Sequence, residues 1–136
     1  MEMAVITRAE NLASVESGEL VDGPKGIVLA VDDLAGFEAG FVEAGGAARL
    51  ARQGFTLFAV AGEKAEAAHD SLDDALEAEG FIDVVTTFHD DDTPDELAAF
   101  LATTAKANNL TQLVVICRAD AGYEAEVLKH LGSQES

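Results

Sequence analysis

Four short, largely apolar segments recur along the chain, and they constrain its fold more than any other feature. They are GIVLAV (26–31), FTLFAV (55–60), DVVTTF (83–88) and QLVVIC (112–117). Short apolar runs without polar alternation are typical of strands that are buried on both faces of a parallel sheet. We therefore expect these four segments to be the strands of one such sheet.

The residues between these segments have helical periodicity. Apolar stripes at helical spacing predict helices over 34–53, 63–79, 93–109 and 121–131. The Gly45-Gly46 pair is expected to weaken or bend the first of them. The start of the third is predicted from its capping residues: Thr93 can cap, Pro94 fits the first helical position, and the Glu96 carboxylate can reach back to the cap N–H.

This alternation predicts a single three-layer α/β domain over residues 26–132, flavodoxin-like or Rossmann-like, with helices on both faces of a four-stranded, mostly parallel sheet. Because crossovers between parallel strands are right-handed, few topologies remain. With the apolar segments numbered in chain order, we favour the strand order 2-1-3-4, and 3-2-1-4 is the alternative. Residues 1–25 are expected to form an arm in which Met3–Thr7 can add a short edge strand. Residues 133–136 are expected to fray.

The chain is strongly acidic, with 26 Asp and Glu against 8 Lys and Arg and a formal charge of −18. This negative field would repel phosphate backbones and argues against nucleic-acid binding. No run of about 18 apolar residues is present, so no membrane span is predicted. Residues 1–25 lack the basic start and apolar stretch of a signal peptide. The single cysteine, Cys117, cannot form an internal disulfide, which fits a reducing cytoplasm.

Three interpretations of the acidity are open. It can be an ordinary solvated surface, a halophilic adaptation in which salt screens the self-repulsion, or a docking surface for a basic protein partner. Under the second interpretation, stability should change between low and molar KCl.

The carboxyl ends of the predicted strands gather titratable side chains. In an open α/β sheet, ligands bind beyond these ends at the topological switch point, which in the order 2-1-3-4 lies between the first and third strands. Asp32, Asp33 and Asp90 could ligate Mg²⁺ there. His89 could then act as a general acid or base, and Arg118 could stabilise transition-state charge. The competing interpretation is that these carboxylates cap the helices that follow them.

Two other side chains are candidates for a special role. His69 precedes Asp70 on the second predicted helix, at the edge of its apolar stripe, where a carboxylate partner could make it a pH switch. Cys117 ends a buried strand next to Arg118, a cationic neighbour that could make the thiol reactive. For both, the commoner role is structural: a hydrogen-bonded helix histidine and a buried, packed cysteine.

Familiar cofactor motifs are missing from the sequence. The first apolar segment runs into VDDLAGFEAG, which lacks the Gly-x-Gly-x-x-Gly loop of dinucleotide-binding domains. Neither the loop of P-loop NTPases nor a Gly-x-Ser-x-Gly nucleophile elbow occurs. Asp32 and Asp33 would repel a flavin phosphate, so no cofactor is expected, apart from Mg²⁺ if the carboxylate site exists.

The segments GEKAEAAHDSLDDAL and VVTTFHDDDTPDELAAFL resemble a family of small bacterial α/β proteins of unknown function. The resemblance covers roughly residues 55–105 and rests on a helix with His69-Asp70 and a strand that runs into Thr86-Thr87-Phe88-His89. That family usually has tryptophan where this chain has Phe88. The resemblance implies a stand-alone α/β domain without an established activity. It also implies a shared role for His69 and His89, as a structural polar pair between helix and strand end.

These features favour a small, acidic, cytoplasmic interaction protein over an enzyme, with a protein partner such as a basic toxin or effector. The alternative is a Mg²⁺-dependent phosphoester hydrolase that uses the carboxylate site. A homodimer is also open, because a hydrophobic content of 49% is high for so charged a chain. An edge strand or the last helix could mediate such a dimer.

Overall fold

In the part of the chain that the structure describes, five strands form one parallel sheet. The computed structural model describes residues 5–8, 22–31, 34–43, 45–81, 83–89, 93–116, 126–127 and 129. The strands are β1 (Val5–Arg8), β2 (Lys25–Ala30), β3 (Phe55–Ala61), β4 (Val85–His89) and β5 (Gln112–Ile116). The last four are the apolar segments of the sequence, and β1 is the edge strand expected in the N-terminal arm. The parallel α/β class is therefore confirmed.

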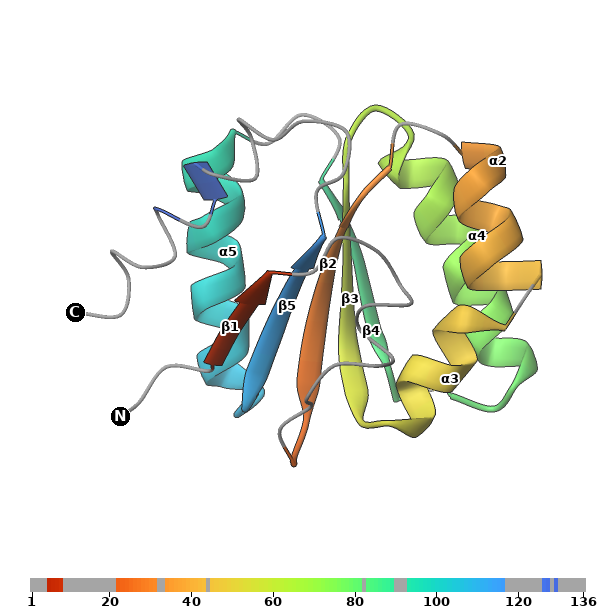
Figure 1. Ribbon diagram of the computed structural model, residues 1–136, viewed down its shortest axis with the longest axis horizontal. Coiled ribbons are helices and arrows are strands. Elements are labelled where there is room, and N and C mark those ends of the chain that lie inside the picture. Colours follow the sequence, from red (N-terminus) through yellow and green to blue (C-terminus); the bar gives the residue numbers. More distant parts are fainter. Residues whose placement is uncertain are drawn as a thin grey trace.

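The strands lie in the order β1-β5-β2-β3-β4 (Figure 1). For the four apolar segments this is 3-2-1-4 read from the opposite edge, so the favoured order 2-1-3-4 is wrong and the alternative is correct. Both orders allow right-handed crossovers. The side chains decide between them: all of β3 except Thr56 is buried, which suits a central strand, whereas β4 contains two threonines and is mostly exposed or half-buried, which suits an edge.

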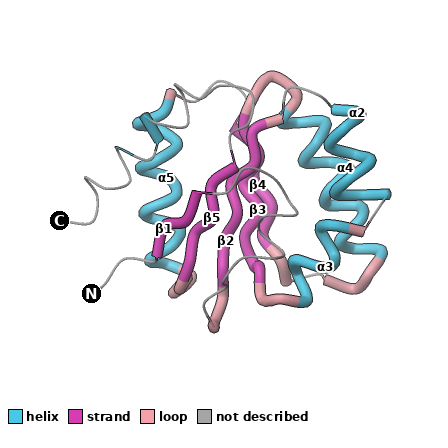
Figure 2. The backbone as a smooth tube through the Cα atoms, in the orientation of Figure 1, coloured by secondary structure: helices cyan, strands magenta, loops and turns pink. Residues whose placement is uncertain are grey.

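Helices cover both faces of the sheet (Figures 1 and 2). One face carries α2 (Leu34–Phe37), the π-helical segment η1 (Glu38–Glu43), α3 (Gly46–Arg52) and α4 (Ala65–Ala78), and the other carries α5 (Pro94–Ala107). The helix expected over 34–53 is interrupted because Gly45 has a left-handed φ of 77°. None of the helices in the described ranges is long and apolar enough to cross a membrane. The helix expected over 121–131 lies outside the described residues except for Glu126, Val127 and Lys129, and the tail 133–136 lies outside them entirely.

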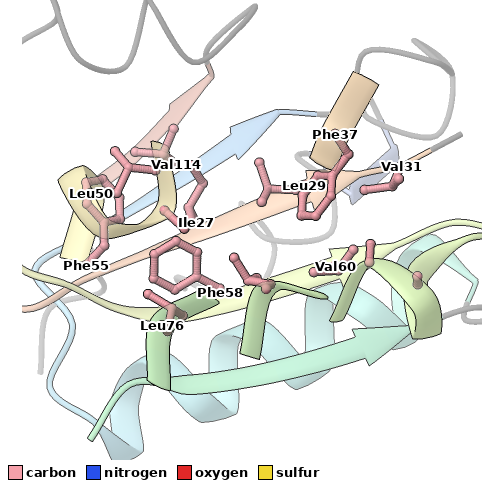
Figure 3. Packing of buried hydrophobic residues seen from close by; sticks show 14 residues of the cluster. Ile27, Leu29, Val31, Phe37, Leu50, Phe55, Phe58, Val60, Leu76 and Val114 are labelled. Atoms are coloured by element: carbon pink, nitrogen blue, oxygen red, sulfur yellow. The ribbon is translucent and has the colours of Figure 1, made fainter. Parts of the chain in front are cut away.

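Two apolar layers fill the space between the sheet and its helices. Alternate residues of a strand serve opposite layers. Ile27 and Phe58 pack on the α4 side, with Leu72 and Leu76 of that helix in the same cluster (Figure 3). On the α5 side the cluster is made of Val28, Ala59, Ala61, Leu97, Ala98, Leu101, Leu113, Val115 and Val127. A chain with this charge is thus held together by apolar clusters on both faces of the sheet, with a smaller third cluster of Leu57, Ala105 and Leu110.

The start of α5 has the predicted capping arrangement. The Glu96 carboxylate accepts a hydrogen bond from the backbone N–H of Thr93 at 3.0 Å, and the Thr93 hydroxyl donates to the same carboxylate oxygen at 2.8 Å. The hydrogen bond from the Thr93 backbone, followed by that from its side chain, lowers the pKa of Glu96 below 4.5. The nearby Asp95 charge opposes this shift without reversing it.

We expect Glu96→Gln to lower the free energy of unfolding at neutral pH and to have little effect in acid. A carboxyl group whose pKa is lower in the folded state stabilises that state above its unfolded pKa, here 4.5, and loses this contribution as the pH falls through the folded value. Glutamine resembles the protonated acid, so the difference between wild type and variant should vanish at low pH. Urea unfolding of both proteins across this range measures it. A difference that is independent of pH would contradict the charged cap.

Candidate functional site

The observed strand order moves the topological switch point. The switch point lies between the adjacent strands β2 and β5. It does not lie between β2 and β4, because β3 stands between these two strands and keeps them about 10 Å apart. Asp32 and Asp33 follow β2, Asp90 follows β4 and Arg118 follows β5 in the sequence, and all four lie outside the described residues. A carboxylate site shared by β2 and β4 would therefore have to reach across the end of β3.

Among the described residues, no three or more His, Cys, Asp and Glu side chains form a group that could hold a metal ion. His89 is the described member of the predicted Mg²⁺ site, and its imidazole lies against α5. The ring centroids of His89 and Phe100 are 4.6 Å apart, and His89 Nε2 is 3.0 Å from Thr87 Oγ1. The magnesium-dependent hydrolase stays a prediction.

The two histidines of the predicted polar pair contact opposite faces of β4. His69 of α4 places Nε2 at 3.1 Å from Thr86 Oγ1, whereas His89 bonds to Thr87. Successive residues of a strand point to opposite faces, so Thr86 lies on the α4 face and Thr87 on the α5 face. The structure therefore does not bring His69 and His89 together. The polar contact between helix and strand joins His69 to Thr86.

Four residues, termed here the Thr86 cluster (His69, Asp70, Asp73 and Thr86), tie α4 to β4 by hydrogen bonds. His69 Nε2 lies 3.2 Å from the Thr86 carbonyl oxygen and 3.1 Å from the Thr86 hydroxyl oxygen. The Thr86 hydroxyl donates to Asp73 Oδ1 at 3.1 Å. His69 Nδ1 lies 3.2 Å from Asp70 Oδ1. Helix and strand are thereby joined through both the side chain and the backbone of Thr86.

The order of groups Asp70, His69, Thr86 resembles the acid, base and nucleophile of a hydrolase triad, but the Thr86 hydroxyl also has a carboxylate acceptor, Asp73. In a triad the imidazole takes the proton of the hydroxyl group. Here Nε2 lies 3.2 Å from the Thr86 carbonyl oxygen as well as 3.1 Å from its hydroxyl oxygen, and the hydroxyl donates to Asp73. The hydrogen bonds of the Thr86 cluster thus join α4 to β4, and its hydroxyl donates to a carboxylate, unlike the hydroxyl of a triad.

β4 ends the described sheet on this side and pairs with β3. The His89 carbonyl accepts the Gly62 N–H at 3.2 Å, so the backbone of His89 faces β3. Because backbone direction alternates along a strand, Val85 and Thr87 also bond toward β3. Thr86 and Phe88 then direct their N–H and C=O groups outward, as the contact between His69 and the Thr86 carbonyl requires.

Two large apolar side chains are exposed on this edge strand. Val85 is 43% exposed and Phe88 is 40% exposed. Phe88 lies on the α4 face, where its ring centroid is 5.2 Å from that of His69, and Val85 lies on the opposite face. Exposed apolar residues on an edge strand mark either a binding surface or an aggregation hazard.

The solvent-facing side of α4 is uniformly acidic. The helix carries five carboxylates and neither lysine nor arginine. Their spacing of three or four residues places them on one stripe, away from the buried face. These residues, termed the α4 acidic stripe, are Glu66, Asp70, Asp73, Asp74 and Glu77. Asp70 and Asp73 belong also to the Thr86 cluster, so the stripe borders the outer edge of β4.

The acidic stripe had a signal in the sequence, since its spacing fits the predicted helix over 63–79. No signal in the sequence identified Thr86 as the partner of His69 and Asp73, because these contacts depend on how α4 packs on β4. Cys117 lies outside the described residues.

A family described as "Domain of unknown function (DUF7684)" matches residues 11–134. The chain belongs to the DUF7684 family. No curated protein matches the chain. The matched part of this DUF7684 domain contains β2 to β5 and hence both the Thr86 cluster and the α4 acidic stripe, whereas β1 precedes it.

Proposed function

We propose that this DUF7684 domain is a non-enzymatic binding module that receives a basic protein partner on the surface formed by α4 and β4. The α4 acidic stripe carries the proposal: five carboxylates without a cation in the helix, next to the exposed Phe88. An apolar centre with a polar rim is the usual composition of a protein-binding surface. An acidic field also speeds the encounter with a basic partner.

The carboxylates of the α4 acidic stripe repel one another, and binding of a cationic partner would offset the resulting loss of helix stability. Glu66 and Asp70, Asp70 and Asp74, and Asp73 and Glu77 are each four residues apart on α4. Like charges at this spacing lower helix stability by about 0.2–0.5 kcal/mol per pair. A cationic partner would relieve this repulsion. Salt would relieve it too, so a halophilic adaptation stays a second prediction, and a decisive test must depend on the position of the charge as well as on its amount.

The class of partner we infer is a basic toxin or effector, because an acidic surface neutralises such a protein by covering its cations. A cytoplasmic setting is part of the same proposal, since Cys117 has no second cysteine with which to pair. His69, Asp70 and Thr86, which belong to the motif on which the family resemblance rests, lie at the edge of the proposed surface.

We expect the paired substitution Asp74→Asn/Glu77→Gln to weaken binding of a fluorescent oligolysine peptide by about three- to tenfold, since each exposed charge pair contributes up to about 1 kcal/mol. Both side chains are exposed. Fluorescence anisotropy at low ionic strength measures the affinity.

The matched control is Asp22→Asn/Glu43→Gln, which removes the same charge from exposed positions outside α4. It should weaken binding less than about twofold, as expected from long-range screening. Equal losses in the two variants would show that the peptide responds to net charge alone and would contradict a binding surface on α4.

A further inference from the structure

We infer that the outer edge of β4 receives an extended, lysine- or arginine-bearing segment of the partner as an added strand. This inference rests on the proposed function and specifies how the partner would bind. It starts from the position of β4 at the end of the described sheet and from the outward direction of the Thr86 and Phe88 backbone groups.

The backbone of this edge offers hydrogen bonds to a further strand. Among the described residues, His69 is the group bonded to the outward side of β4, at the Thr86 carbonyl oxygen. Within that same part of the chain, the N–H of Thr86 and both backbone groups of Phe88 are left for an incoming strand. Main-chain hydrogen bonds of this kind supply the affinity in strand addition, and pockets for alternate side chains supply the specificity.

The two faces of the edge differ, and this difference selects the sequence of the added segment. On the α4 face, the His69 ring lies against Phe88 and contacts Asp70, and Asp73 accepts a hydrogen bond from Thr86, two residues before Phe88. A lysine or arginine there can pack its stem on the Phe88 ring and place its charge near the carboxylates. On the opposite face, the exposed Val85 favours an apolar neighbour. The edge thus favours a segment in which basic and apolar residues alternate.

Charge excludes a second copy of this chain as the preferred occupant. Pairing two β4 edges would bring two α4 acidic stripes together in a protein with a formal charge of −18. Like charges brought together at an interface cost several kcal/mol. A basic segment has the opposite effect, since it places cations beside Asp70 and Asp73.

The test uses three synthetic peptides on the intact protein. The first alternates lysine and valine over about eight residues, a typical strand length. The second has the same composition with lysines and valines in separate blocks. The third is the alternating peptide with N-methyl groups on one edge, which removes its N–H donors there. Affinities come from fluorescence anisotropy, and amide hydrogen exchange of Phe88 and Thr86 is followed by NMR.

We expect the alternating peptide to bind at least about tenfold tighter than the block peptide, because it adds main-chain and cross-strand contacts to the same charge. N-methylation should remove this advantage. The alternating peptide should also slow exchange of the Phe88 amide, whereas the amides of β2, already paired on both sides, should not change. Phe88→Pro removes the outward N–H of residue 88, which is not bonded to β3, and should therefore abolish the preference for the alternating peptide. If this variant does not fold, the N-methylated peptide makes the same test on the wild type.

Other results would overturn the inference. Equal, charge-dependent binding of all three peptides, with no change at Phe88, would exclude strand addition and leave the proposed function standing. Failure of every peptide to bind would overturn both. A dimer that forms without peptide and is lost in Phe88→Pro, seen by light scattering, would assign the edge to a second copy.

Discussion

Leu72→Ala is expected to lower the free energy of unfolding by about 2–5 kcal/mol, the range for truncating a fully buried leucine. Leu72 is 0% exposed and lies on the inner face of α4, in the cluster that contains Phe58 and Leu76. Its removal leaves a cavity between the helix and the sheet, because neighbouring side chains relax only partly. Urea unfolding monitored by circular dichroism measures the change.

Leu72→Met is the control, since it keeps the volume and should cost less than about 1.5 kcal/mol. A loss below about 1 kcal/mol for the alanine variant would mean that α4 is not packed on the sheet through Leu72. The same packing holds the α4 acidic stripe beside β4. The charge substitutions for the binding experiments are therefore confined to exposed positions, where a loss of affinity does not report a loss of folding.

Gly62→Ala is expected to lower the free energy of unfolding by about 2–4 kcal/mol, through backbone strain and overpacking together. Gly62 has a φ of 110°, which side-chain-bearing residues rarely adopt, and a Cβ at this position would lie 2.7 Å from the carbonyl oxygen of Val31. That atom belongs to the backbone and cannot rotate away. Thermal and urea unfolding of the variant measure the loss.

Gly80→Ala separates strain from overpacking. Gly80 also has a positive φ, 86°, but nothing lies within 4 Å of the position that a Cβ would occupy there, so only strain of about 1–2 kcal/mol is expected. Equal losses at Gly62 and Gly80 would contradict the close approach to Val31. The Gly62 turn also matters for the proposed surface, because its N–H bonds the His89 carbonyl and so determines which residues of β4 face outward.

The histidines show how a motif can be found before its role is understood. His69-Asp70 and the Thr86–His89 segment are adjacent in space, as their resemblance to a family motif implied, but the contact is between His69 and Thr86. Alternation along β4 sends His89 to the other face, against Phe100. Once the face of β4 that α4 covers is known, the alternation of side chains along the strand is enough to separate His89 from His69.

Local patterns in the sequence determined where each strand lies, the capping of α5 by Thr93 and Glu96, and the break at Gly45, because each depends on interactions within a few residues. The acidic face of α4 was determined in the same way, since helical spacing alone aligns its carboxylates. Strand order was decided only by the tertiary structure: right-handed crossovers permit both orders, and the choice depends on which strand is buried on both faces. The tertiary structure likewise decided which residue His69 contacts and which backbone groups of β4 point outward. Both follow from packing between segments that are distant in the chain.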